Sequence, residues 1–385
     1  MISIELADKN TCTGCGACAY VCPQEAISLK RDRGGFLFPE IDEKKCIKCG
    51  RCLRVCHIEN VTKNTRKKAF FGWHKDPVVR ENSSSGGLFT ALAQTVLALG
   101  GVVYGHVVDF DTLYVHCLRA DREELLAQMR QSKYVESDIT QVFDMLKNDL
   151  SEKKLVMFCG TPCQCAALRQ QFGFNSNLLL VSFVCHGVGS PKLFREHYSH
   201  VCKNKEIKEI RMRDKSFGWH DNSVCIKYKG KHKDYLAHYS IDSYYYCDIA
   251  LAMYIRDCCY SCKYTDMHAS DITISDFWNV INTEYRNLDD NKGISLAVSN
   301  TEQGNHYILQ LDNAQLRQLD LADCEYAFFE NALPDSPYVI NKIKRKNEFL
   351  DHSEKRGFES ATRKYMNQMV LRHLKVAVKK MKRIK

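Results

Sequence analysis

The sequence predicts three structural units: a small α+β domain at the N-terminus, a larger mixed α/β domain, and a basic C-terminal helix. Closely spaced cysteines lie before residue 60, apolar strands alternate with helical segments from about residue 70, and the chain end is rich in lysine and arginine. With 385 residues, of which 45% are hydrophobic, the chain can form two or three domains. A disordered chain and a disulfide-stabilised miniprotein are therefore excluded.

The net charge of +9 comes from one end of the chain. Ala361 to Lys385 contains nine Lys or Arg and no Asp or Glu, so the first 360 residues carry 46 basic and 46 acidic side chains. A neutral body does not favour nucleic-acid binding, and no nucleic-acid partner is expected. The start, MISIELADKN, has no charged segment followed by an apolar run, so the sequence predicts no signal peptide and a cytoplasmic location.

Eight cysteines in the N-terminal unit form two runs with the spacing C-x2-C-x2-C-x3-C. They are Cys12, Cys15, Cys18 and Cys22 in the first run and Cys46, Cys49, Cys52 and Cys56 in the second. The runs resemble a bacterial two-cluster ferredoxin, in which the fourth cysteine of each run binds the other cluster. The resemblance implies one 4Fe-4S cluster on the first three cysteines of run one plus Cys56, and a second on the first three of run two plus Cys22.

Structural zinc and reduced buried thiols are the alternatives for these cysteines. The ferredoxin-like domain is predicted to span residues 1–62. His57 stands where the first run has Pro23, a departure that is expected to alter the turn without removing a ligand.

Alternating strands and helices after a polar linker predict the mixed α/β domain over residues 70–335. The predicted strands are Val102 to Val108, Leu155 to Cys159, Leu178 to Cys185, Ile272 to Phe277 and Ile294 to Ser299. The predicted helices are Ser85 to Leu99, Ile139 to Leu150, Gln164 to Gln171, Lys192 to Lys203 and Ser243 to Arg256. Gly100 and Gly101 interrupt the apolar segment from Ser83 to Val108, which favours a helix followed by a strand over a transmembrane helix.

Several loops of this domain have residues suited to binding. Asn82 to Gly87 combines three serines and two glycines before a helix, which predicts an anion site, although a simple N-cap would explain one serine. Gly160 to Gln164 follows a strand, where α/β proteins bind ligands. Four thiols, at Cys163, Cys185, Cys259 and Cys262, are a full ligand set for a third 4Fe-4S cluster.

Other interpretations of these thiols remain open. The C-x2-C pair at Cys259 and Cys262 could bind zinc or no metal. Cys159, Cys165 and Cys258 are neighbouring substitutes as cluster ligands.

From residue 70 to about 330 the chain resembles the beta subunit family of coenzyme F-420 hydrogenases and dehydrogenases. This family includes beta subunits of some formate dehydrogenases and flavin reductases that act on chlorophyll intermediates. The matching motifs are SSSGGLF (83–89), SKYVES (132–137), FCGTPCQ (158–164), CHG (185–187), CYSC (259–262) and DITISDFW (271–278). The resemblance implies FAD in this domain, a 4Fe-4S cluster beside it, and hydride exchange at the flavin.

The resemblance also implies roles for single residues. The cofactor-binding residues carried over are Ser83, Ser84, Ser85, Gly86, Gly87, Ser132, Lys133, Tyr134, Gly160 and Thr161. Lys133 is expected to offset the charge of a reduced flavin, with a solvated loop lysine as the alternative. Lys133, Tyr134 and His186 are the predicted catalytic residues, and His220 is a further candidate proton donor; a core or surface role is the alternative for each. Asp271 and Asp276 are expected to be strand-end or cap residues.

A chain that has both one-electron clusters and hydride chemistry needs a converter, and a flavin is one. The sequence therefore predicts an iron-sulfur flavoprotein oxidoreductase that moves electrons between ferredoxin-type clusters and FAD. The expected partners are a ferredoxin or another redox protein and a small-molecule hydride donor or acceptor, which could be F-420. A non-catalytic electron-transfer subunit and an iron-sulfur module without flavin are the alternatives.

Residues 336–385 are predicted to form a helical basic tail. Between Met366 and Ile384, apolar residues recur every three or four positions, with basic side chains largely off that stripe. Such a helix suits contact with an anionic membrane surface, which would place the protein peripherally at the inner membrane, or with an acidic ferredoxin. A solvated terminal helix is the alternative.

Overall fold

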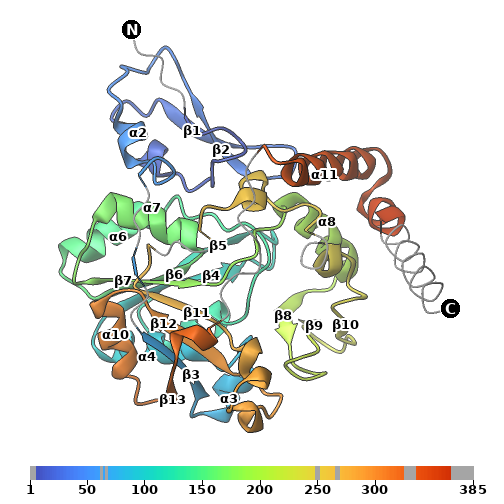
Figure 1. Ribbon diagram of the computed structural model, residues 1–385. Helices are drawn as coiled ribbons and strands as arrows, with labels where there is room; N and C mark the ends of the chain where they lie inside the picture. Colours follow the sequence, from blue (N-terminus) through green and yellow to red (C-terminus); the bar gives the residue numbers. More distant parts are fainter. Residues whose placement is uncertain are drawn as a thin grey trace, which may run out of the picture.

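The computed structural model describes residues 6–60, 64–65, 68–247, 252–264, 269–324 and 335–365. A small front domain, an eight-stranded sheet with helices on both faces, and a three-stranded sheet make up this part of the chain (Figure 1). No helix among the described residues is long and apolar enough to span a membrane. The apolar segment from Ser83 to Val108 forms a helix and a strand, as predicted.

The front domain contains two short helices and one hairpin. The helices are α1 (Ala17–Tyr20) and α2 (Arg51–Val55), and the hairpin strands are β1 (Ile27–Arg31) and β2 (Leu37–Ile41). Each helix follows a glycine in the left-handed region, Gly16 at φ 81° and Gly50 at φ 71°, where a side chain would be strained. Each glycine lies between the second and third cysteine of its run, so the turn keeps these cysteines close together.

The eight-stranded sheet has the order β13-β3-β12-β11-β7-β6-β4-β5. Its parallel strands are β4 (Val102–Val108), β6 (Val156–Gly160), β7 (Leu178–Phe183) and β11 (Ile272–Asp276). Its antiparallel strands are β5 (Val115–Ala120), β12 (Ser295–Ser299), β3 (Lys68–His74) and β13 (Ala314–Leu319). The four parallel strands end at one edge of the sheet, the edge at which α/β proteins bind ligands.

Alternate residues of the parallel strands pack against different helical layers. One face, with Val103 and Leu179, packs against α4 (Leu88–Ala98), α5 (Leu126–Met129) and α10 (Glu302–Leu309). The other face, with Leu178 and Leu180, packs against α6 (Val142–Ser151) and α7 (Pro162–Phe172). Because both faces are covered, the strands are continuous apolar runs, and this made them recognisable in the sequence.

The second sheet was not predicted. Its antiparallel strands are β8 (Ile207–Asp214), β9 (Ser223–Tyr228) and β10 (Tyr235–His238), which share a core with α8 (Pro191–Cys202), α9 (Ser243–Tyr245) and α11 (Pro337–Arg356). β8 buries Ile207, Ile210 and Met212 in that core, but charged residues stand between them. β8 was not predicted because these charged residues interrupt the apolar pattern expected of a buried strand.

The predicted helix from Ser243 to Arg256 is wrong at its C-terminal end. α9 ends at Tyr245, Tyr246 and Cys247 follow as a π-helical turn, and residues 252–256 are not helical, while residues 248–251 lie outside the described residues. Ile255 forms an antiparallel bridge with Gly189, and the Arg256 guanidinium donates to the carbonyl of Leu37 at 2.7 Å. These long-range contacts override the helical propensity of the segment.

The front domain packs against the body and is not merely tethered to it by the polar linker. Ala17 and Val55 belong to the core beneath α6 and α7. The Ser190 hydroxyl at the start of α8 donates to the carbonyl of Gly34 at 2.5 Å. Arg33 forms an ion pair of 3.1 Å with Glu354 on α11.

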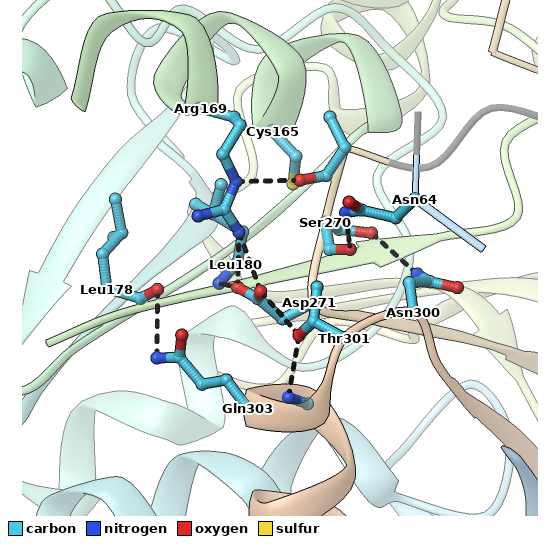
Figure 2. A network of polar contacts seen from close by, with 12 residues as sticks. Asn64, Cys165, Arg169, Leu178, Leu180, Ser270, Asp271, Asn300, Thr301 and Gln303 are labelled. Atoms are coloured by element: carbon cyan, nitrogen blue, oxygen red, sulfur yellow. Dashed lines mark hydrogen bonds and ion pairs between the residues drawn. The ribbon is translucent and has the colours of Figure 1, made fainter. Parts of the chain in front are cut away.

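A buried polar network around Asp271 attaches α7 to the central sheet (Figure 2). Arg169 on α7 donates from Nη2 to both carboxylate oxygens of Asp271, each at 2.8 Å. The Leu180 N–H donates to Asp271 at 2.8 Å and the Thr301 hydroxyl at 2.9 Å. Asp271 is therefore structural, as expected for a strand-end residue.

The C-terminal region begins with α11 and continues as helix over residues 358–365. Residues 366–385, which make up most of the predicted basic amphipathic helix, lie outside the described residues.

Candidate functional site

The front cysteines form two groups, and each run contributes its fourth cysteine to the other group. Cys22, Cys46, Cys49 and Cys52 line one small cavity of about 20 Å³. Cys12, Cys15, Cys18 and Cys56 are close enough to influence one another's ionisation. Burial and the neighbouring sulfurs raise the pKa of Cys15 to about 12 in the metal-free protein.

Among the described residues, no three His, Cys, Asp or Glu side chains converge on a point in the way that one metal ion requires. A 4Fe-4S cube is larger than an ion and holds its thiolates further apart.

A third group of thiols lies between the front domain and the central sheet. Cys163 is near the start of α7, Cys185 follows β7, and Cys259 and Cys262 lie within and directly after a 3-10 helix, η3 (Asp257–Ser261). A hydrogen bond with Cys258 lowers the pKa of Cys259, but burial and the sulfurs of Cys262, Cys185 and Cys163 raise it overall. The fold therefore brings together all four cysteines predicted for a third cluster.

The three substitute ligands lie in different places. Cys258 is hydrogen-bonded to Cys259 and adjoins the third group. Cys165 is fully buried and donates to the carbonyl of Val181 at 3.5 Å. Cys159 lies in the wall of a larger cavity.

This larger cavity, of about 530 Å³, lies at the carboxyl ends of the parallel strands. Its wall contains ten of the predicted site residues, namely Ser83, Ser84, Ser85, Gly87, Ser132, Lys133, Tyr134, Thr161, Cys185 and His186. Gly86 and Gly160 instead permit close packing, because an added Cβ would lie 2.4 Å from the Gly72 carbonyl oxygen and 2.6 Å from the Phe158 ring, respectively. Cys185 belongs both to the third thiol group and to the cavity wall.

The serine loop offers fewer groups to a ligand than predicted. The Ser83 hydroxyl donates to Val79 and the Ser85 hydroxyl to Ile294, at 2.7 and 2.8 Å, and so both are used to hold the loop in place. Ser84 Oγ lies 3.2 Å from Ser132 Oγ and accepts from the Ser132 N–H at 2.9 Å. Of the predicted anion site, the groups left to bind a ligand are Ser84, Ser132 and the start of α4. This helix begins at Leu88 and not, as the sequence predicts, at Ser85.

Arg213 at the end of β8 adds a buried positive charge to the cavity wall. Its guanidinium donates to the two oxygens of Asp276 at 3.0 and 3.1 Å, to the Tyr134 hydroxyl at 3.2 Å and to the Ser84 carbonyl at 3.3 Å. Only 5% of Arg213 is exposed. Sequence reasoning missed this residue because it lies in no motif.

Asp276 is held from a second side by tryptophan. Trp219 Nε1 donates to Asp276 at 2.7 Å, and the Trp219 ring stacks on Trp278 with centroids 4.3 Å apart. Asp276 is thus a strand-end residue, as expected, but one that positions Arg213 in the cavity wall.

Lys133 lies in the cavity wall with all three N–H donors bound by the protein. Its Nζ donates to the carbonyls of Gln128, Met129 and Arg130 at 3.2, 2.8 and 2.6 Å. Burial lowers the pKa of Lys133 to about 7. Lys133 is therefore a cap at the end of α5 with a partly buried side chain.

Tyr134 and His186 are neighbours in the cavity wall, with ring centroids 5.4 Å apart. Burial lowers the pKa of His186 to about 4, so its imidazole is neutral at pH 7. His220 lies elsewhere: its Nε2 is 2.7 Å from a carboxylate oxygen of Asp289, and its ring is partly exposed. This exposed pairing fits the surface role that was the alternative for His220.

Two parts of the chain match known domain families. Residues 153–323 match the model for the C terminus of the coenzyme F420 hydrogenase/dehydrogenase beta subunit, and residues 11–62 match the model for the 4Fe-4S dicluster domain. The comparison with curated proteins found no match. Among solved structures, a chain of the F420-reducing nickel-iron hydrogenase complex from Methanosarcina barkeri is similar, with 14% sequence identity and a TM-score of 0.47 over 77% of this chain and 95% of that chain.

The dicluster match supports two 4Fe-4S clusters on the eight front cysteines. The second match covers the strands and loops that surround the third thiol group and much of the cavity. The chain thus combines a 4Fe-4S dicluster domain with the C-terminal domain of the coenzyme F420 hydrogenase/dehydrogenase beta subunit family.

Proposed function

We propose that the protein is an iron-sulfur flavoprotein oxidoreductase that moves electrons between its 4Fe-4S clusters and FAD, with hydride exchange to a small organic substrate or a deazaflavin coenzyme. The observation that carries this proposal is the double position of Cys185, in the third thiol group and in the wall of the 530 Å³ cavity. A cluster bound by the third thiol group would therefore lie next to a ligand in the cavity, with Cys185 between them.

The cavity is suited in size and chemistry to a flavin nucleotide. Ligand cavities in proteins usually measure about 300–1,000 Å³ and are mostly apolar with a few well-placed polar groups. Here Leu88, Phe89 and Ile274 supply apolar wall, while Ser84 and Ser132, with the start of α4, would hold the phosphates. Bound FAD would supply the conversion between one-electron and two-electron transfer.

The side chains of the cavity wall favour a negatively charged occupant. Arg213 is held permanently in the wall by Asp276, and Lys133 brings a second cationic group whose charge varies near pH 7. Neutral His186 and the Tyr134 hydroxyl are the proposed groups for proton transfer to or from the organic substrate.

The three thiol groups form a series from the surface to the cavity. Cys49 of the second group is exposed, Cys12 of the first group is buried, and Cys15 packs against the core of the body. Cys163 of the third group lies close enough to Cys15 for their charges to interact. This order supports electron transfer between an external carrier and the cavity through all three groups.

Anaerobic reconstitution tests the proposal. The full chain should bind about twelve iron and twelve acid-labile sulfide atoms, as three 4Fe-4S clusters require, and one FAD. Cys185→Ser should lower the iron content to about eight, whereas Cys324→Ser, outside all three groups, should leave it unchanged. Iron near eight in the wild-type chain would contradict the third cluster, and absence of flavin absorption after incubation with FAD would contradict the flavoprotein.

One alternative function is favoured by the family description as a beta subunit: an electron-transfer subunit of a larger complex, with no turnover of its own. Stopped-flow mixing of the FAD-loaded protein with reduced F-420 or another hydride donor distinguishes the two. Flavin reduction by a small donor supports the oxidoreductase. Flavin that is reduced only through the clusters supports the electron-transfer role.

A further inference from the structure

The segment that carries Cys46, Cys49 and Cys52 presents a basic surface with an apolar tip. The five basic residues from 44 to 54, which we call the outer basic face, are Lys44, Lys45, Lys48, Arg51 and Arg54, and all are exposed. No acidic residue lies among them, and with the preceding Asp42 and Glu43 the net charge over residues 42–54 is +3. Ile47, between the cations, is 61% exposed.

Within the described ranges, none of the five cations of the outer basic face forms an ion pair, whereas Lys30 and Arg33 of the same domain pair with Glu40 and Glu354 at 2.5 and 3.1 Å. Unpaired cations on one face project a positive potential into the solvent. An exposed isoleucine amid them has the apolar-centre and charged-rim arrangement of a protein interface.

The outer basic face adjoins the second thiol group directly. Ile47, Lys48 and Arg51 line the small cavity together with all four cysteines of that group. Cys49 is exposed, whereas the first group faces the body through Cys15. The second cluster is therefore the one that an external redox protein can approach most closely.

We propose that the outer basic face is the docking surface for a small acidic protein that carries one electron, a proposal that rests on the proposed function. The positive potential steers the acidic carrier, and Ile47 provides the desolvated centre of the contact. One electron leaves the reduced carrier and enters the second cluster, so the carrier is oxidised and the cluster reduced by one electron. No bond forms or breaks, and no proton needs to move.

A charge-reversal pair tests the docking surface with a matched control. Lys44→Glu with Lys45→Glu changes the charge without altering residues that line the cluster cavity. The control, Lys231→Glu with Lys233→Glu, makes the same charge change on the exposed loop between β9 and β10, far from α2 (Figure 1). The probe is a dithionite-reduced acidic ferredoxin with a single cluster, mixed by stopped flow with the oxidised, full-length holoprotein.

At low ionic strength the ferredoxin should reduce the test variant at least about tenfold more slowly than the wild type. A tenfold change is the lower end of the effect of electrostatic steering on association rates. The control should stay within twofold of the wild type. At about 1 M salt, where the Debye length is about 3 Å, the difference should disappear. Ile47→Ser should slow the reaction without changing its salt dependence.

Wild-type rates in the charge-reversal variant, or equal slowing in the control, would overturn the docking surface. The extent of cluster reduction by excess dithionite alone should be the same in all variants. Equal extents would show that their clusters are intact. If the ferredoxin reduces the clusters while bound flavin stays oxidised, the proposed function fails and the docking surface stands.

Discussion

Arg256 donates from Nε to the carbonyl oxygen of Cys12 at 2.8 Å, and its Nη2 lies 3.9 Å from the Cys12 sulfur. The same guanidinium pairs with buried Glu136. Arg256 stands two residues before Cys258, on the segment that carries the third thiol group. A buried cation from the body thus lies against Cys12, a proposed ligand of the first cluster.

Removal of this cation should lower the reduction potential of the first cluster. A nearby positive charge stabilises the more negative, reduced state, so Arg256→Gln should shift the potential down by about 60 mV, a tenfold change in a one-electron equilibrium. Arg256→Lys should retain most of the wild-type potential. A redox titration followed by electron paramagnetic resonance measures both.

The same titration contains its own control. The second cluster, on the outer side of the domain, should keep its potential in both variants. Arg256→Gln also leaves Glu136 without its cation, so the double variant with Glu136→Gln separates the two charges. An unchanged first-cluster potential in Arg256→Gln would contradict the role of this residue.

Loss of Arg213 should weaken flavin binding. Arg213→Met removes the cation of the cavity wall and leaves Asp276 without its partner, so we expect at least about tenfold weaker FAD binding and about 3–5 kcal/mol lower stability. Flavin fluorescence titration and denaturant unfolding measure the two effects. Glu40→Gln removes the partner of Lys30 in an exposed pair and should cost at most about 1 kcal/mol with FAD affinity unchanged. Equal FAD affinity in Arg213→Met would remove Arg213 from the binding site.

The network around Asp271 should affect stability alone. Asp271→Asn breaks a fully buried ion pair with Arg169 and should lower the free energy of unfolding by about 3–5 kcal/mol. Thr301→Ala removes the hydrogen bond to Asp271 and the N-cap contact with the Gly304 N–H, and should cost about 1–3 kcal/mol. Iron content and cluster potentials at low temperature should match the wild type, and a changed potential would show that Asp271 acts on the redox centres.

His197 should make stability depend on pH. Burial alone would lower the pKa of His197, but hydrogen bonds with Asp242 and Glu359 raise it to about 9. A raised pKa contributes stability that is complete below the unfolded value of about 6.5 and is lost as the pH rises through 9, by about 3 kcal/mol in total. His197→Gln should abolish this loss, as denaturant unfolding between pH 6 and pH 9.5 would show. Parallel pH curves for the variant and the wild type would contradict it.

The parts of the structure that local patterns specify were predictable. β7, with its sequence LLLVSF, is an unbroken apolar run because both of its faces are buried. The cysteine runs indicate clusters because the spacing of their cysteines along the chain is that of 4Fe-4S ligands. The predicted residues Ser84, Ser132 and Tyr134 line one cavity. The antiparallel β8 was missed because its alternating charges resemble those of a surface loop.

The remaining features depend on contacts between distant residues. Arg256 and Cys12 are 244 positions apart, and no local pattern indicates that one donates to the other. Arg213 likewise acquires its role only when β8 meets the end of β11 at Asp276. Ser83 and Ser85 matched the expected motif, but a local hydrogen bond to Val79 uses the Ser83 hydroxyl and a tertiary one to Ile294 uses the Ser85 hydroxyl.

The helix α11 contacts both sides of the boundary between the front domain and the body. Glu354 pairs with Arg33 of the front hairpin, and Lys346 of the same helix pairs with Asp257, next to Cys258. Electron tunnelling slows exponentially as the gap between donor and acceptor widens. By contacting both sides of that gap, α11 would hold the proposed first and third clusters at a fixed separation, so the fold would set the rate of electron transfer between them.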